Sequence, residues 1–114
     1  MSSVMRNAYT AVIARGEAWQ GAVQTEPYEA AWAAEALFFV RVLEAEGSGR
    51  AIARVQISPD GMHWVDEGGE LVIEAAQGHL SFVRVAQFGG WLRLAVVVPP
   101  SAVITVVATL ALKA

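Results

Sequence analysis

The sequence predicts an all-β protein, a single-domain antiparallel β-sandwich of the jelly-roll type with about eight strands. Turn-forming residues recur at even spacing through the last two thirds of the chain, at 47–49, 59–61, 68–69, 77–78, 89–90 and 99–100. The apolar runs between these turns are too short for helices of ordinary length. Several of the runs also alternate apolar and polar residues, which is the period of a strand with one buried face.

The chain length and composition favour one domain with a real core. At 114 residues the chain has the size of a single domain, expected to span 1–114. Hydrophobic residues make up 55% and charged residues 17%, against roughly 45–50% and 25% in average soluble domains. The first residues show no apolar core of signal-peptide length, so we expect them to belong to the mature fold.

The expected strands follow the apolar runs. Two are expected near the start, at 9–15 and 18–24. The others lie between the turn signals, at 36–44, 50–58, 63–66, 71–75, 80–88, 91–98 and 102–113. In the run 50–58, for example, Ala51, Ala53 and Val55 fall on one face while Arg54 and Gln56 fall on the other. We expect a short helix at 27–36, because alanine and glutamate favour helix and Pro27 suits a first helical turn.

The uncharged stretch 94–112 has about the length of a membrane-spanning helix. Pro99 and Pro100 would break such a helix near its middle. From Ala102 onward the residues alternate, with Ile104 and Val106 on one face and Val103 and Val107 on the other. We therefore expect a buried strand here and no membrane partner.

Charge and cysteine content exclude several classes of partner. The net charge is −3 and the eight basic residues are scattered singly, so no basic stripe is available for nucleic acid. The chain has no cysteine, which excludes disulfides and thiolate metal sites and leaves the compartment open.

The segment 58–64, SPDGMHW, predicts a tight hairpin. Asp60 and Gly61 suit the turn, Ser58 can bond the turn backbone, and Trp64 begins the return strand. Alternatively, Asp60, Asp66 and Glu67 could bind calcium. A structural hairpin is favoured, since calcium loops carry a denser alternation of oxygen ligands, and no metal or cofactor is expected.

The pattern S-x-D-G-x-x-W formed by Ser58, Asp60, Gly61 and Trp64 resembles the hairpin of discoidin-like jelly rolls, the coagulation factor 5/8 type C or galactose-binding-like domains. The later FVRV at 82–85 is similar to the strand that follows in those domains. The resemblance implies the fold and no particular ligand. Discoidin-like domains are longer and often cysteine-clamped, and their ligand-binding spikes have no counterpart here. The same hairpin also occurs in small β-sandwich proteins of phage virions.

The segment QFGGWLRLAV predicts a second hairpin, with Gly89-Gly90 as a two-residue loop between the strands 80–88 and 91–98. Phe88 and Trp91 would then form a cross-strand aromatic pair. With Arg93 and Arg84 nearby, the aromatic residues could stack a sugar ring, or they could anchor another subunit.

Catalysis has little support. Ser58, His63 and Asp66 could form a triad on paper, but one small hairpin offers no buried, oriented base. The other histidine, His79, stands apart, and no phosphate-binding glycine loop is present. We therefore expect that this protein is not an enzyme.

Several outward strand faces are themselves apolar, among them those of Ile52, Val97, Val103 and Val107. Apolar patches of this kind usually mark an interface. The sequence therefore predicts a non-catalytic, self-associating structural protein, most concretely a virion, shell or capsid decoration subunit that contacts copies of itself or other assembly proteins. The alternative is a carbohydrate-binding module that binds a glycan with Trp91, Arg93, Trp64 or Tyr28. The interface or ligand candidates are Trp64, Trp91, Arg93, Arg84, Phe88, His63, Val103 and Val107.

Overall fold

The computed structural model describes residues 8–114, and in this range the chain forms strands and loops without a helix. The nine strands are β1 (Ala8–Trp19), β2 (Ala22–Gln24), β3 (Tyr28–Glu29), β4 (Glu35–Gly47), β5 (Arg50–Ser58), β6 (Val65–Glu74), β7 (Leu80–Ala86), β8 (Trp91–Val97) and β9 (Ala102–Lys113). The predicted all-β sandwich is confirmed. The expectation that the first residues join the fold falls, for residues 1–7, outside the described range.

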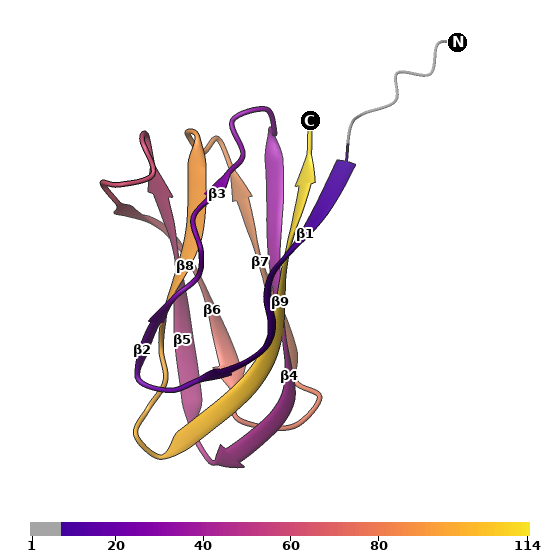
Figure 1. The fold of residues 1–114 in the computed structure, drawn as a ribbon, viewed down its shortest axis with the longest axis vertical. Helices are drawn as coiled ribbons and strands as arrows, with labels where there is room; N and C mark the ends of the chain where they lie inside the picture. The colour runs from indigo at the N-terminus through magenta and orange to yellow at the C-terminus, as the bar shows by residue number, and fades with distance from the viewer. Residues whose placement is uncertain (1–7) are drawn as a thin grey trace.

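The strands form two antiparallel sheets that pack face to face (Figure 1). One sheet has the order β1-β9-β4-β7, and we call it sheet A. The other has the order β2-β8-β5-β6, with β3 also paired to β8, and we call it sheet B. Successive strands cross repeatedly between the sheets, and with β2 and β3 counted as one interrupted strand this is the strand order of a jelly roll. In Figure 1, β1 and β2 face the viewer while β6 and β7 lie behind.

The core lies between the sheets and consists of the inward-facing residues of both. Phe38, Val40 and Val42 of β4 meet Val55 of β5 and the buried residues of β8 and β9. Trp19 at the end of β1 is among the largest fully buried side chains, with 1% of its surface exposed. Burial of the inward face along β9 and along most of β4, β5 and β8 explains much of the excess of apolar residues in the composition.

The strands with regular alternation were predicted well. β5 and β9 have the predicted limits, and β7 and β8 end within two residues of the predicted ends. The uncharged stretch 94–112 contributes to β8 and β9, both central strands of their sheets. None of the described residues lies in a helix long and apolar enough to cross a bilayer.

The predicted helix at 27–36 is wrong. Tyr28 and Glu29 form the short strand β3, which pairs with Leu92 and Trp91 of β8. The N–H of Ala30, which is fully buried, then donates to Gly90 O (2.7 Å). Backbone pairing with β8 thus outweighs the weak helix propensity of this segment.

The predicted turn at Gly68-Gly69 is also wrong, because β6 runs through it as one strand. Residues 67–69 form a bulge between the pairs Arg54–Glu70 and Gln56–Asp66. Gly68 has a positive φ of 115°, a backbone conformation that glycine adopts readily and other residues rarely do. β1 likewise continues through Gly16 (φ 64°) by bulging, so the first turn falls at residues 20–21 rather than before Ala18.

The predicted hairpin at Gly89-Gly90 does not form. β7 lies in sheet A and β8 lies in sheet B, so the connection crosses from one sheet to the other. The left-handed residue in this connection is Gln87 (φ 56°), not a glycine. The expected cross-strand pair of Phe88 and Trp91 is therefore wrong, since the two residues do not flank a shared hairpin.

Candidate interaction surfaces

The loop between β5 and β6 is organised by Ser58 and Asp60. Ser58 Oγ accepts from the N–H groups of Gly61 (2.8 Å) and Asp60 (3.2 Å), and donates to Asp60 Oδ1 (3.0 Å). Asp60 Oδ1 also accepts from the N–H groups of Met62 (2.8 Å) and His63 (2.9 Å), while Asp60 Oδ2 lies 2.7 Å from His63 Nδ1. The predicted turn is present, and Ser58 is buried because the loop folds over it.

The carboxylates of Asp60 and Asp66 have separate sets of partners. The backbone N–H groups of His63 and Met62, followed by the His63 side chain, hold the pKa of Asp60 far below its usual range. Asp66 is bonded instead to Gln56 (2.9 Å) and Arg54 (3.1 Å). Ser58 and His63 thus both contact Asp60 rather than Asp66, and the triad considered from the sequence is not assembled. Among the described residues, no group of three potential metal ligands gathers.

The outer face of sheet B carries a connected polar network. Arg93 Nε donates to Gln56 Oε1 (2.8 Å), and the guanidinium lies 4.2 Å from the centre of the Trp64 ring. Gln56 in turn donates to Asp66, so the network links β8, β5 and β6. Burial lowers the pKa of Arg93 from its ordinary value, although an arginine stays charged at neutral pH. The Trp64 indole therefore covers the Arg93 guanidinium, which in turn occupies one face of the ring.

The other two predicted aromatic anchors are also packed. A Cβ atom on Gly61 would lie 3.1 Å from the Trp91 ring, which means that the loop backbone rests on this indole. Phe88 is half-buried against the hydrophobic core. Trp64 thus packs against Arg93, Trp91 against the 58–64 loop and Phe88 against the core, whereas His63 is exposed.

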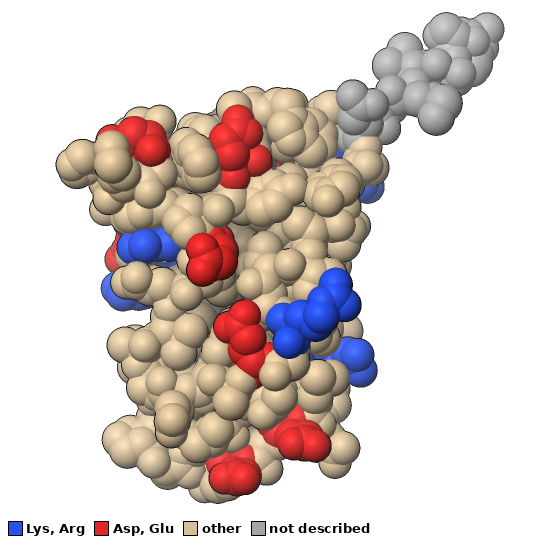
Figure 2. All heavy atoms as spheres, in the orientation of Figure 1, with Lys and Arg blue, Asp and Glu red and all other residues tan. Residues whose placement is uncertain are grey.

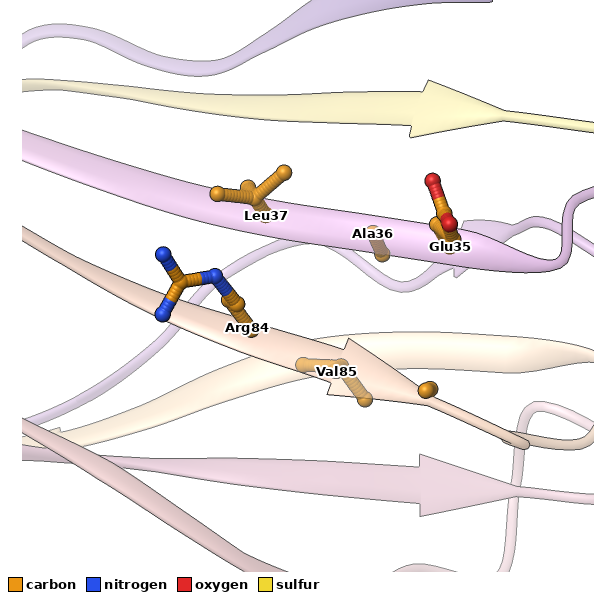
Figure 3. Close-up of a pocket in the computed structure, with 6 residues that line it drawn as sticks. Glu35, Ala36, Leu37, Arg84 and Val85 are labelled. Atoms are coloured by element: carbon orange, nitrogen blue, oxygen red, sulfur yellow. The ribbon is translucent and has the colours of Figure 1, made fainter.

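The outer face of sheet A is different, because a short repeat lines it. β4 carries LFFVR at 37–41 and β7 carries LSFVR at 80–84, and the two strands pair so that Phe39 lies opposite Phe82. In the flanking rows Leu37 lies opposite Arg84, and Arg41 lies opposite Leu80. Figure 3 shows Leu37 and Arg84 on one side of this strand pair, while Ala36 and Val85 point to the other. The outward positions thus read Leu, Phe, Arg on both strands, in opposite directions.

The central row of this face is aromatic and accessible. The rings of Phe39 and Phe82 have centroids 6.1 Å apart, and the guanidinium of Arg84 lies 5.1 Å from the centre of the Phe82 ring. Phe82 is 48% exposed and Leu80 is 59% exposed. Val12 of β1, which is also exposed, extends the row through Thr109 of β9. We call Leu37, Phe39, Arg41, Leu80, Phe82 and Arg84 the Leu-Phe-Arg patch.

The predicted candidates divide between two faces. Arg84, Val103 and Val107 lie on sheet A, with both valines half-buried, whereas Trp64 and Arg93 lie on sheet B. The sequence interpretation missed Leu37, Phe39, Leu80 and Phe82. The signal that could have found them is the repeat L-x-F-V-R, whose alternation places its first, third and fifth residues on one face.

Two pockets lie near these surfaces. One, of about 270 Å³, lies where β4 begins and β7 ends, beside Glu35, Leu37 and Arg84 (Figure 3). The other, of about 180 Å³, is apolar and lies beside Ile57, Pro59 and Val65 at the loop end of the sandwich. On the face shown in Figure 2, charged side chains are separated by wide uncharged areas, so no single-sign stripe appears there.

No protein-family model matches the chain, and no curated protein matches it. Among solved structures, the SPBc2 prophage-derived protein YomS is similar over 100% of this chain and 99% of its own, with a TM-score of 0.65 and 10% identity. A chain of infectious bursal disease virus, Gx strain, is similar over 97% of this chain and 32% of its own (TM-score 0.56, 11% identity). The CBM36-1 domain of a xylanase from the hindgut metagenome of Trinervitermes trinervoides is similar over 92% and 96% (TM-score 0.52, 9% identity).

At these identities the likeness shows the β-sandwich fold alone. The predicted sandwich is confirmed, whereas the specific resemblance to discoidin-like domains stays a prediction, since none of the three structures is described as one.

Proposed function

We propose that this protein is a non-catalytic structural subunit that assembles with copies of itself, most concretely as a virion, shell or decoration subunit of a phage-type assembly. The structural similarity to a prophage-derived protein and to a chain of a virus supports this class of function. The surface that carries the proposal is the Leu-Phe-Arg patch on the outer face of sheet A.

The argument rests on the contrast between the two outer faces. On sheet B, the Arg93, Gln56 and Asp66 side chains form a bonded polar network, and the exposed apolar side chains of this outer face are the small valines Val72 and Val97. On sheet A, Phe82 and Leu80 remain about half exposed beside Phe39. Full burial of an exposed Phe or Leu side chain contributes about 1.5–3 kcal/mol, so covering these half-exposed side chains contributes roughly half of that free energy for each of them. Aromatic residues and arginines are also the residue types enriched at interface centres.

The direct test is the mass of the particle in solution, measured by size-exclusion chromatography with light scattering at micromolar concentration. We expect a species heavier than one chain, with a share that grows as the protein is concentrated. A monomer throughout the micromolar range would contradict the proposal.

A carbohydrate-binding module is the second candidate. The observation that favours it is the stack of Arg93 on Trp64 next to Gln56, an arrangement of aromatic and hydrogen-bonding groups that suits a sugar ring, on a fold shared with the CBM36-1 domain. A glycan array tests it. Specific binding that is lost in Trp64→Ala and kept in Trp32→Ala, which removes an exposed tryptophan outside this network, would favour this function over assembly.

A further inference from the structure

The four sheet edges are protected to very different degrees. β1 carries two bulges, and β6 carries the bulge at 67–69. The edge formed by β2 and β3 consists of strands of three and two residues, with Pro27 just before β3. Bulges, short strands and prolines are features that prevent an edge from pairing with another chain. β7 has none of them, since it pairs with β4 over seven residues without a register shift.

The free edge of β7 also belongs to the Leu-Phe-Arg patch. Leu80, Phe82 and Arg84 point outward from it, and β4 on its other side presents the same three residue types in the opposite direction. The β4–β7 pairing therefore shows which kind of strand pairs with β7 in antiparallel orientation: one that reads Leu-x-Phe-x-Arg. β7 is itself such a strand.

We propose that β7 pairs in antiparallel orientation with β7 of a second copy, across a two-fold axis that places Phe82 opposite Phe82. This inference rests on the proposed self-association and names one contact for it, at the strand edge: side chains of the two patches meet side by side across the axis, and the outer face of the joined sheet stays open. The two copies of sheet A join into one continuous sheet, and the phenylalanine row of one copy runs on into that of the other. A two-fold interface of this kind is self-complementary and closes at a dimer.

The charges agree with this register. With Phe82 at the centre, Arg84 of each copy lies opposite Leu80 of the other, as Arg84 lies opposite Leu37 within one chain. Like charges directly opposite each other would destabilise the pair, and this register contains none on the outer face. On the inner face, Ser81 lies opposite Val83 of the second copy. The unpaired backbone groups along β7 gain partners at the same time.

Cysteine crosslinking tests the register, because the chain has no cysteine of its own. In the paired arrangement, the Phe82→Cys variant brings residue 82 of one copy opposite residue 82 of the other, within the Cα separation of up to about 7 Å that a disulfide spans. The matched control is Phe39→Cys, in the same row but one strand inward. Its two copies lie three strand spacings apart, about 14 Å, which is too far for a disulfide.

Under mild oxidation we expect Phe82→Cys to form a covalent dimer as the main product and Phe39→Cys to remain uncrosslinked. A second test keeps Phe82 and mixes equal amounts of Leu80→Cys and Arg84→Cys chains. Because residue 80 of one copy lies opposite residue 84 of the other in this register, we expect crosslinks between the two variants. Circular dichroism of each variant checks that it folds.

The outcomes separate this inference from the proposed function. Crosslinking of Phe39→Cys as readily as Phe82→Cys, or no crosslink in samples that sediment as oligomers, would overturn the β7 pairing and leave self-association standing. A chain that sediments as a monomer would overturn both.

Discussion

Phe39 on β4 and Phe82 on β7 lie opposite each other on the outer face of sheet A, with their ring planes inclined by 35°. The pair stands on a surface rather than in the core, because Phe82 is at the outer side of an edge strand. A pair of aromatic rings contributes about 0.5–1.5 kcal/mol beyond its buried area. This contact orients two rings on a surface that no other part of the described chain covers, and Phe82 remains 48% exposed.

The 58–64 loop should depend strongly on Ser58. In Ser58→Ala the part-buried N–H groups of Asp60 and Gly61 lose the hydroxyl of the buried Ser58 as their acceptor, so we expect a loss of about 1–3 kcal/mol in the free energy of unfolding, measured with urea. The control is Ser101→Ala, which removes an exposed bond to Ser48 O and should cost about 1 kcal/mol or less. Equal losses would show that Ser58 does not organise the loop.

Stability should fall in acid partly through Asp60. Its folded pKa is depressed, so its contribution is present above the unfolded value of about 3.9 and is lost as the pH falls through the folded value. We expect the melting temperature of the native chain to drop below about pH 4 more steeply than that of Asp60→Asn, which is less stable at neutral pH. Parallel melting profiles of the two proteins would contradict the role given to this carboxylate.

Gly61 should be replaceable only at a cost, because it combines a positive φ (80°) with contact to Trp91. Gly61→Ala adds a clash with the indole to the backbone strain of about 1–2 kcal/mol. Gly78→Ala is the matched control, since Gly78 has φ 86° and open space around it. We expect Gly61→Ala to be the more destabilised by roughly 1 kcal/mol or more in urea unfolding, whereas equal effects would mean that the loop does not rest on Trp91.

The tryptophans should differ according to burial. Trp19 is enclosed between the sheets, and Trp19→Ala should cost about 3–5 kcal/mol in the free energy of unfolding. Trp32 is 44% exposed, and Trp32→Ala should change stability by about 0.5 kcal/mol or less. A tolerated Trp19→Ala would contradict the packing of β1 described above.

Regular alternation made part of this fold predictable. Alternation over 50–58 and 102–113 locates β5 and β9 with their correct limits, because a strand with one buried face shows that period. Alternation does not indicate which strands pair with each other. Gly89-Gly90 has the local chemistry of a hairpin, yet the connection crosses between sheets, because the partners of β7 and β8 are distant in sequence.

The same limit applies to the candidate surfaces. The Ser58 and Asp60 turn is local, and short-range reasoning found it. Phe39 and Phe82 are more than forty positions apart and meet only through the β4–β7 register. Trp64 and Trp91, in contrast, looked like free anchors and are packed by Arg93 and by the loop backbone, which no local pattern indicates.

Sedimentation velocity of the native chain beside Phe82→Glu and Val97→Glu tests the central claim most directly. Both substitutions place a carboxylate at an exposed apolar position, one on the outer face of sheet A and one on that of sheet B. We expect the native chain and Val97→Glu to sediment as oligomers at micromolar concentration, and Phe82→Glu to sediment as a folded monomer. A monomeric native chain, or oligomers that persist in Phe82→Glu and dissociate in Val97→Glu, would contradict assembly through sheet A.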